Sequence, residues 1–576
     1  MPSATNPEAF PFNKPLAQAW IERCVSTHDR CNIHTTGAWY PTHLLQLKHH
    51  GRAISLVVTD THKPTGRYAT LSHRWGPHKY RQLTTETIDE FQNAIELSAL
   101  PTIFQDAISV VHDLGIQYIW IDALCIKQDA DLVDWNLEAP KMHKVYAHSF
   151  LTISATSSAD DGSGSLFSNA TSRTTPPPPL VQANVARLVR HRRAKNRARN
   201  SRRQSPTSYR KLQLLSKQYY LVNGHVWSDE IEETPLQNRG WVFQERVLSS
   251  RNLHFGPTQL AWECQETSAL ENFKNEIPPG ITETSKSGIV AGAMAPQLSG
   301  RTQETFRKSW GDLVAQYSRC GLTKSEDKLI AFSGVAQMIE EARNDQYIAG
   351  LWKSTLVTDL AWRRLSNAAP SCTGYSPRAP SWSWLSVDGE VHFAPPDKPT
   401  FFASIISHPG KDLAGSKLKI AEGNILIEGV LLPLDSIEMN KDVVESFSVG
   451  GVRILDGWSA EESHLDLDDS RYESMEFGQK EVLFILPLFS GKTSLFTLVI
   501  AKKNEDEYRR VGSAQLQIMK MDFHLGKASR GWQSLPRTQQ GERRTVPMSV
   551  NISTVTVLRM VAEQRKQNRS QVIRLV

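Results

Sequence analysis

Residues Tyr118–Asp129 read YIWIDALCIKQD, so an unbroken apolar run leads directly into an aspartate. The run Tyr118–Ile121 predicts a strand that is covered on both faces, as strands of a parallel sheet are. Asp122 would then lie just beyond the carboxyl end of that strand, where open α/β sheets form their ligand crevices. A carboxylate can stay solvated or paired at this edge, whereas burial inside the sheet would be costly. The stretch therefore predicts an α/β sheet with an acidic side chain at its functional edge.

The segments on either side predict further units of the same sheet. Strands are expected at Tyr68–Ser72, Phe150–Ala155 and Arg251–Phe255. Apolar residues at helical spacing predict a helix that begins at Thr102 and stops at Gly115, and a second helix is expected over Ala139–Ala147. This alternation of strands and helices predicts right-handed α/β units.

The length of 576 residues suggests about three or four domains, and the composition changes along the chain. We expect an N-terminal extension at residues 1–60, the α/β domain at 61–265, a mostly helical region ending in a PSWSW segment at 266–395, and a β-rich C-terminal domain at 396–576. In the helical region, patterns over Glu304–Ser318 and Asp327–Glu341 predict helices. The alternating tryptophans of Pro380–Val391 predict a strand.

A polar, Pro- and Arg-rich insertion interrupts the α/β domain at about residues 162–210. Thirteen Lys and Arg residues and no Asp or Glu lie between Gly162 and Ser228, so this segment accounts for the net charge of +6. The composition predicts a disordered, solvated tether, with a short basic helix lined by Val181, Val185, Leu188 and Val189 as the alternative. Arg187–Arg203 could act in nuclear import. It lacks the interleaved aromatic residues that stack on bases, so nucleic-acid binding is not expected.

The remaining motifs argue against several classes of protein. Six cysteines are scattered and form no CxxC pair, which predicts neither a disulfide framework nor a zinc site and favours a reducing compartment; they are Cys24, Cys31, Cys125, Cys264, Cys320 and Cys372. Nucleotide-phosphate and zinc-peptidase motifs are missing. No apolar run reaches the roughly 20 residues that span a bilayer. We expect a cytoplasmic protein, or a nuclear one if Arg187–Arg203 directs import, with no membrane span and no cofactor.

Three distant segments share tryptophan, acidic residues and arginine in apolar surroundings: RYATLSHRWG (67–76), YIWIDALCIKQD (118–129) and NRGWVFQERVLSSRNLHF (238–255). In order and spacing they resemble the motifs of the fungal heterokaryon-incompatibility (HET) domain family, and weaker similarity extends to Val391. The matching residues are Tyr68, Leu71, Ser72, Trp75, Gly76, Trp120, Ile121, Asp122, Cys125, Gln128, Asp129, Arg239, Gly240, Trp241, Gln244 and Glu245. The family's G-L-F-x-x-R segment is replaced here by GSGSLFSNATSR, followed by the insertion.

The resemblance implies a role in non-self recognition and in incompatibility-type programmed cell death, through a protein partner or self-association. It also implies a fold similar to the TIR fold, which has a flavodoxin-like parallel sheet. Some TIR domains cleave NAD with a glutamate on a helix. An NAD-cleaving enzyme is therefore the alternative to a non-enzymatic signalling protein, although it depends on fold analogy alone.

Glu245 and Asp122 are the candidate catalytic residues. Each also has a structural interpretation: Asp122 could cap the following turn, and Glu245 could pair with Arg239 or Arg251. If the two carboxyl groups share a cleft, one pKa should be raised, as an acid catalyst requires.

Other side chains in these segments allow weaker hypotheses. Cys125 and His73 could form a nucleophile and base, but a single cysteine after a strand is usually a packing residue. Trp75, Trp120 and Trp241 are interpreted as core anchors, with nucleotide stacking as the alternative. All these readings require the three segments to meet at one rim of the sheet.

Overall fold

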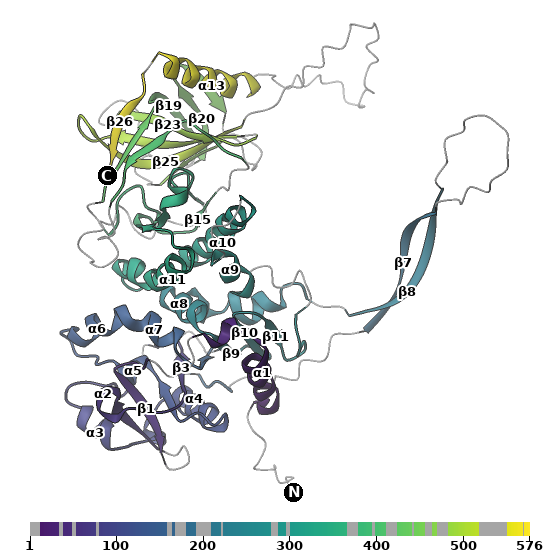
Figure 1. The fold of residues 1–576 in the computed structure, drawn as a ribbon, viewed down its shortest axis with the longest axis vertical. Coiled ribbons are helices and arrows are strands. Elements are labelled where there is room, and N and C mark those ends of the chain that lie inside the picture. The colour runs from purple at the N-terminus through teal and green to yellow at the C-terminus, as the bar shows by residue number, and fades with distance from the viewer. Residues whose placement is uncertain are drawn as a thin grey trace, which may run out of the picture.

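The computed structural model describes residues 12–33, 39–48, 53–76, 80–157, 164–167, 180–191, 209–220, 223–277, 286–294, 300–365, 378–393, 398–409, 423–440, 443–455, 464–468, 482–492, 494–517, 550–567 and 569–576. An α/β region, a helical middle and a β-rich C-terminal region are stacked along the long axis (Figure 1). Among these residues no helix combines the length and the apolar character needed to cross a membrane.

The α/β region is built on a mixed sheet of nine strands, in the order β11-β10-β9-β6-β3-β5-β1-β2-β4. The strands are β1 His43–Lys48, β2 Ala53–Val58, β3 Tyr68–Ser72, β4 Ile95–Glu96, β5 Tyr118–Trp120, β6 Leu151–Ser154, β9 Arg251–Phe255, β10 Leu260–Cys264 and β11 Ser268–Leu270. The central four, β5-β3-β6-β9, are parallel. The outer strands pair antiparallel. The predicted α/β class and the strands at β3, β5, β6 and β9 are confirmed.

Successive parallel strands are added first on one side of β3 and then on the other. From β3 the chain continues to β5 on one side, and then crosses to β6 and β9 on the other side. The carboxyl ends of β3 and β6 therefore border a topological switch point, where open α/β sheets bind ligands.

The helices of this region agree with the sequence pattern except around Pro140. They are α1 Lys14–Thr27, α2 Thr59–His62, α3 Ile88–Asn93, α4 Thr102–Asp113, α5 Asp122–Cys125, α6 Val133–Glu138 and α7 Met142–Ala147. The predicted helix ending at Gly115 is α4, and Gly115 has the positive φ of 73° that a helix stop favours. The predicted helix over Ala139–Ala147 is instead a 3₁₀ turn, Ala139–Lys141, followed by α7, with Pro140 in the first turn.

The helical middle contains α8 Gly240–Leu248, α9 Lys286–Ala293, α10 Gly300–Arg319, α11 Lys328–Arg343 and α12 Leu356–Asp359, with short strands β12 Tyr347–Ile348, β13 Leu351–Trp352, β14 Arg363–Arg364 and β15 Val391–His392. The helices predicted over Glu304–Ser318 and Asp327–Glu341 are confirmed as α10 and α11. Stacked aromatic rings, such as Phe243 and Phe332, join α8 to α11.

The predicted strand over Pro380–Val391 is wrong. Trp384–Ser386 is a 3₁₀ turn capped by the Ser383 side chain, and only Val391 and the next residue form a strand. The two indole N–H groups explain the turn, because they donate in different directions. Trp382 donates to the Gly423 carbonyl and Trp384 to the Gly350 carbonyl.

The β-rich C-terminal region is confirmed as an eleven-stranded sheet with one helix, α13 Val550–Lys566. Its strands are β16 Thr400–Phe401, β17 Ser404–Ser407, β18 Ile425–Gly429, β19 Leu432–Asn440, β20 Val443–Val449, β21 Val452–Leu455, β22 His464–Leu467, β23 Leu483–Ser490, β24 Ser494–Lys502, β25 Glu507–Gln517 and β26 Gln571–Leu575. The division of the chain into four regions stays a prediction, and β1 and β2 lie within the expected extension at 1–60 while pairing into the first sheet.

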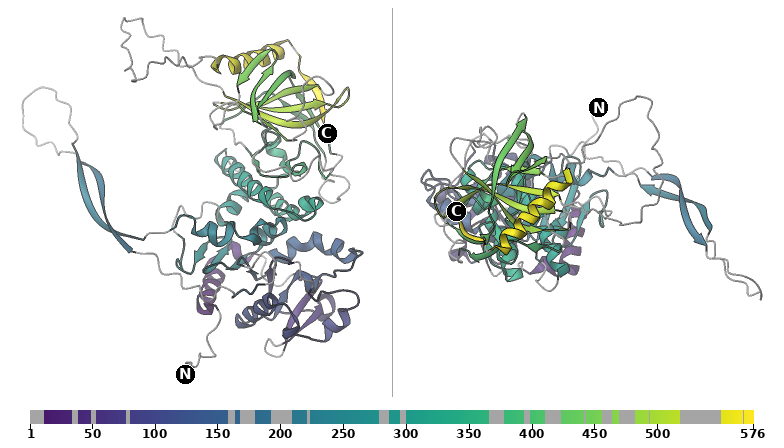
Figure 2. Two further views of the ribbon diagram at one scale, coloured as in Figure 1. Left: turned by 180° about the vertical axis from the view of Figure 1, so that it is seen from behind. Right: turned by 90° about the horizontal axis from the view of Figure 1, so that it is seen from above.

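Part of the insertion is ordered, which corrects the predicted disorder. Strands β7 Leu180–His191 and β8 Tyr209–Tyr220 pair antiparallel along their whole length and project from the body (Figures 1 and 2). The alternative of a basic helix lined by Val181 is also wrong, because β-branched residues favour a strand once a partner strand is present. The rest of 162–210, including most of Arg187–Arg203, lies largely outside the described residues.

Candidate functional site

The three motif segments meet at the carboxyl ends of the parallel strands. Trp75 follows β3, Asp122 follows β5 as the first residue of α5, and Glu245 lies in α8. The indole Nε1 of Trp75 donates a hydrogen bond of 2.6 Å to Asp122 Oδ2. The charge of Asp122 acts in turn on the Glu245 carboxyl. The predicted meeting of Trp75, Asp122 and Glu245 is thus observed at the switch point of the sheet.

Asp122 is held from three sides at the rim of this site. In addition to Trp75, the backbone N–H of Ala123 donates to Oδ1 at 2.8 Å, and His73 Nδ1 lies 3.8 Å from the same oxygen. The Asp122 side chain is 26% exposed. The carboxylate therefore accepts from the first N–H of the following turn and remains accessible at the crevice.

Glu245 is the buried carboxyl of the site, at 7% exposure. Its pKa is raised to about 7, chiefly because burial removes hydration and also because of the negative charge of Asp122. The Ser72 and Tyr146 hydroxyls and the Arg239 guanidinium oppose this rise. One raised pKa is what we expected of two carboxyl groups that share a cleft.

The arginines predicted to pair with Glu245 have other partners. Arg239 donates to the His73 carbonyl at 3.4 Å, and it affects Glu245 through the interaction of their charges and not through a hydrogen bond. Arg251 donates to Asn32 and to the Phe150 carbonyl. In the described part of the chain no salt bridge to Glu245 is found.

Two buried polar atoms near the two carboxyl groups, His73 Nε2 and the Tyr80 hydroxyl, find no hydrogen-bond partner among the described residues. Burial lowers the pKa of His73 in spite of the nearby Asp122, so its imidazole is neutral. Buried polar atoms are normally satisfied by protein or ordered water. Unsatisfied polar atoms beside a buried carboxyl whose pKa is raised are typical of a site that holds water or a small polar ligand.

The other motif residues build the frame of the site. The Tyr68 hydroxyl donates to the Val145 carbonyl at 2.6 Å, and the Asp129 carboxylate accepts from the backbone N–H of Thr85 at 3.0 Å. Gln128 Nε2 donates to the Ile126 carbonyl at 3.0 Å. The motif residues Leu71, Ile121 and Gln244 are buried, and Gly76 follows Trp75 in the loop after β3.

Gly240 allows α8 to approach the turn before α11. A Cβ atom at Gly240 would come within 2.6 Å of the Leu322 side chain. The backbone N–H of Gly240 donates to the Gly321 carbonyl at 2.9 Å, and Gly321 donates back to Asn238 at 2.7 Å. The third motif is therefore fixed to the helical middle through its backbone.

The three motif tryptophans, which were interpreted as core anchors, occupy different places in the structure. Trp120 is buried against Tyr146, with ring centroids 5.8 Å apart, as expected of a core anchor. Trp241 lies away from the site. Its Nε1 donates to Asp327 at 3.3 Å, and its ring packs on that of Trp135. Trp241 and Glu245 lie four residues apart in α8, which places them about one turn apart on the same side of the helix, and each meets a different partner along it.

Cys125 does not form a nucleophile and base with His73. Burial raises the pKa of the Cys125 thiol, and the charge of Asp122 acts in the same direction. Its backbone carbonyl, not its sulfur, meets an imidazole, that of His43, at 3.0 Å. Cys125 is a packing residue.

Two tyrosines of the site were missed from the sequence. Burial raises the pKa of both Tyr80 and Tyr146, and the negative charge of Asp122 acts in the same direction on both. They lie outside the three motifs, Tyr80 in a loop after β3 and Tyr146 in α7. The only sequence signal for Tyr146 was its place in the MHKVYAHS stretch between the second motif and β6.

A separate hollow of about 580 Å³ lies at the opposite end of the strands. Its lining includes Gly66 and Arg67 before β3, Gln117 before β5 and Phe150 before β6. These are the amino ends of the strands, so the hollow is distinct from the site at Asp122 and Glu245.

A sequence model of the family described as Heterokaryon incompatibility protein (HET) matches residues 68–245. The match begins at Tyr68, the first residue of β3, and ends at Glu245, the buried carboxyl of the site. It therefore includes all three motif segments up to Glu245. The comparisons with curated proteins and with solved structures find no match.

Proposed function

Residues 68–245 form a domain of the heterokaryon incompatibility family, and from this premise we propose that the chain mediates non-self recognition and incompatibility-type programmed cell death in a fungus. The domain acts through a protein partner or through self-association. The observation that carries the proposal is the position of α8, which belongs to the site on one side and to the helical middle on the other.

Helix α8 can transmit a change at the sheet to the rest of the chain. Glu245 lies with Asp122 at the switch point, while Phe243 stacks on Phe332 of α11 with centroids 6.0 Å apart. The hydrogen bond from Trp241 to Asp327 fixes the first turn of α8 to the start of α11. Packed helices transmit displacements because interiors are dense and resist compression.

The proposal is tested by inducible expression in a fungal host, with cell death scored by a vital dye. We expect the wild-type chain to kill, and Trp241→Phe to reduce killing because it removes the bond to Asp327. Trp39→Phe is the matched control, since Trp39 lies outside α8 and α11 and its ring packs on that of His148. Equal killing by both variants would contradict transmission through α8.

A second candidate function, cleavage of NAD, is favoured by the raised pKa of Glu245 beside Asp122. The parallel strands run second-first-third-fourth in chain order, which agrees with the flavodoxin-like order and supports a TIR-like fold. A carboxyl that titrates near neutrality could orient a ribose or exchange a proton. We rank this function second because Glu245 is 7% exposed, so a nucleotide would need an opened site.

Purified protein incubated with NAD separates the two candidates. Release of nicotinamide that is lost in Glu245→Gln and Asp122→Asn would support the enzyme. If no nicotinamide appears and killing survives both substitutions, the interaction proposal is supported, because it needs the packing of α8 and not the proton of Glu245.

The location of the chain is part of the same proposal. We propose that it acts in the cytoplasm, and that Arg187–Arg203 adds nuclear import. A fluorescent fusion tests this, since deletion of residues 192–208 should then remove any nuclear signal without changing the cytoplasmic one.

A further inference from the structure

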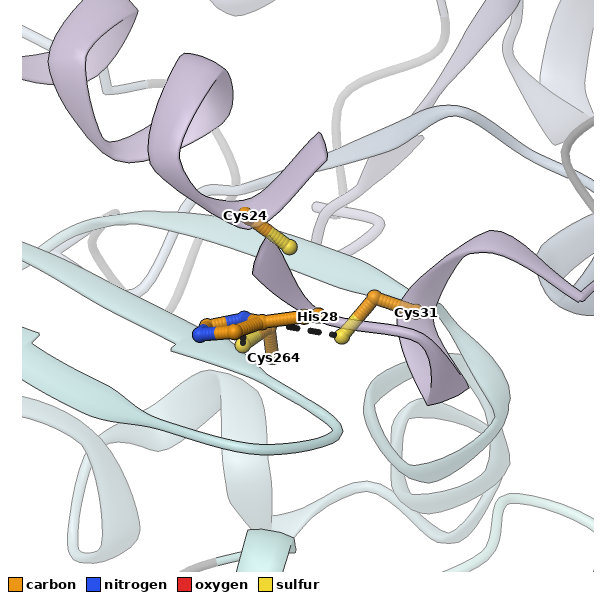
Figure 3. Close-up of side chains that lie close together, drawn as sticks. All are labelled: Cys24, His28, Cys31 and Cys264. Carbon is orange, nitrogen blue, oxygen red and sulfur yellow. Dashed lines mark hydrogen bonds between the residues drawn. The ribbon is translucent and has the colours of Figure 1, made fainter. Parts of the chain in front are cut away.

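Four potential metal ligands gather where the N-terminal helix α1 meets β10, on either side in sequence of the region that the family model matches. Cys24 lies at the end of α1, His28 follows it, Cys31 lies in the 3₁₀ turn Arg30–Asn32, and Cys264 ends β10 (Figure 3). All four side chains are buried, and their donor atoms lie within 4.8 Å of one another. We propose that Cys24, His28, Cys31 and Cys264 bind one zinc ion.

The distances fit a single tetrahedral ion. Zinc binds thiolate sulfur at about 2.3 Å and imidazole nitrogen at about 2.0 Å, so neighbouring donors of a tetrahedron lie roughly 3.5–3.8 Å apart. His28 Nδ1 lies 3.4 Å from Cys264 Sγ and 4.0 Å from Cys31 Sγ. The nitrogen that faces the sulfurs is therefore Nδ1, and small side-chain rotations bring the donors to bonding distance.

The ligand types select zinc among the common metals. Three soft thiolates with one imidazole in a compact tetrahedral set suit zinc, whereas calcium and magnesium prefer oxygen ligands. An iron–sulfur cluster divides its four ligands between irons. The compact spacing of these donors does not match that division. A set of four protein ligands leaves no open position, which is the arrangement of a structural zinc site.

The surroundings of the four side chains suit a negatively charged centre. Three thiolates around Zn²⁺ carry a net charge of −1, and two buried cations face them. The charge of Arg251 acts on Cys24, and that of Lys286 interacts with Cys264 and Cys31. The backbone N–H of Thr267 also donates to Cys264 Sγ at 3.3 Å. Hydrogen bonds to ligand sulfurs typically support metal centres.

Packing alone explains this cluster less well. A buried cysteine often serves as a small apolar residue, but the cluster also buries an imidazole and two cations. Burying charge without compensation is costly. Glu263 compensates part of the charge of Lys286, and a zinc–thiolate centre would add to this and compensate Arg251. The described cysteines are free thiols in this structure, so no disulfide competes for the sulfurs.

The zinc ion would join the two ends of the α/β region. Cys24, His28 and Cys31 precede β1, whereas Cys264 lies at the turn between β10 and β11. The same two parts also meet through Trp20, whose Nε1 donates to the Lys274 carbonyl at 2.7 Å, and through the Arg30 N–H, which donates to Glu266 at 2.9 Å. The folded unit thus extends beyond residues 68–245 on both sides.

This proposal replaces the expectation of no zinc site. The spacing C-x₃-H-x₂-C at Cys24, His28 and Cys31 was visible, but the sequence contains no CxxC pair and the fourth ligand lies far along the chain. Only the fold brings Cys264 to the other three.

Metal analysis of the full-length chain, purified without chelators, tests the site. We expect close to one zinc per chain, and a large loss of zinc in each of Cys24→Ser, Cys31→Ser and Cys264→Ser. Cys125→Ser and Cys320→Ser are matched controls that should keep the zinc, because these cysteines lie elsewhere. Wild-type protein without zinc, with iron in its place, or with zinc that the three substitutions leave unchanged would overturn the proposal.

A second measurement does not depend on variants that fold. Replacement of zinc by Co²⁺ in the wild-type chain should give the intense visible absorption of tetrahedral cobalt together with thiolate-to-cobalt charge-transfer bands. Octahedral cobalt spectra, or a Cys24–Cys31 disulfide found by intact mass in non-reduced protein, would contradict the site.

Discussion

Trp75 and Asp122 are joined by a hydrogen bond of 2.6 Å across 47 positions of sequence. The indole N–H of one motif meets the carboxylate of the next at the carboxyl ends of β3 and β5. Glu245 of the third motif completes the group through its coupling to Asp122. The bond between Trp75 and Asp122 therefore fixes the rim of the site on which the functional proposals depend.

Replacing Trp75 by phenylalanine should destabilise the domain, since it removes the donor to Asp122 and keeps most of the ring. Hydrogen bonds to charged groups contribute about 1.5–3 kcal/mol, and Asp122 is partly hydrated, so we expect a loss of about 1–2 kcal/mol in the free energy of unfolding. Urea unfolding measures it. Trp39→Phe should have a smaller effect, and equal losses would mean that ring volume, not the hydrogen bond, matters.

Glu245 should make stability depend on pH. Its pKa is raised from 4.5 to about 7 in the folded chain, so the folded state holds this proton more tightly than the unfolded state does. The stability from the protonated carboxyl is complete below about pH 4.5 and falls as pH rises to about 7, by up to about 3 kcal/mol. Glu245→Gln keeps the neutral form at all pH values, so its advantage over wild type should grow between pH 5 and pH 7.5.

Urea unfolding at the two pH values measures this difference. Glu563→Gln, at an exposed position of α13, is the control and should show no such growth. A constant difference between wild type and Glu245→Gln across the range would show that the carboxyl is already ionised at pH 5.

The sequence pattern predicted the elements that depend on local spacing. β3, α4 and β5 follow from apolar patterns and from the Gly115 stop, because their faces are set by residues close in the chain. Trp382 and Trp384 were placed on one strand because alternation is a local signal. Their indole N–H groups instead bond to carbonyls of Gly423 and Gly350, partners that only the tertiary fold supplies.

The sequence predicted those residues of the site that belong to the family motifs. Asp122 lies in the second motif and Glu245 in the third, and the order of the strands brings them together. Tyr80 and Tyr146 lie between motifs, and Cys264 joins Cys24 across almost the whole α/β region. No spacing rule connects such residues, because the register of a sheet decides which distant positions become neighbours.

Gly334 of α11 should tolerate no side chain. A Cβ atom there would clash with the Cβ atom of His143 and lie 3.2 Å from Gln244 Oε1, at the contact of α7, α8 and α11. Gly334→Ala should lower the free energy of unfolding by about 1–3 kcal/mol, as overpacking does. Thermal and urea unfolding measure the effect.

The matched control for this change is Gly311→Ala in α10. Its added Cβ would lie 3.7 Å from Phe393, an ordinary contact, so the gain in helix propensity should stabilise the chain by about 0.5–1 kcal/mol. Effects of the same sign at the two glycines would contradict the close approach of α11 to α7.

Asp468 should be essential to the junction between the helical middle and the C-terminal sheet. It pairs with Arg510 at 2.7 Å with both side chains fully buried, and Arg510 also donates to the carbonyls of Leu360 and Trp362. Asp468→Ala leaves a buried cation without its counter-charge, which typically costs about 3–5 kcal/mol. Urea unfolding followed by tryptophan fluorescence measures the loss.

The exposed pair of Glu438 and Arg453 in the same sheet supplies the comparison. Glu438→Ala removes a carboxylate from an ion pair that water screens, so it should cost at most about 1 kcal/mol. Burial, not ion pairing as such, predicts the difference between the two substitutions. If Asp468→Ala costs no more than Glu438→Ala, water reaches Arg510 and the junction opens in solution.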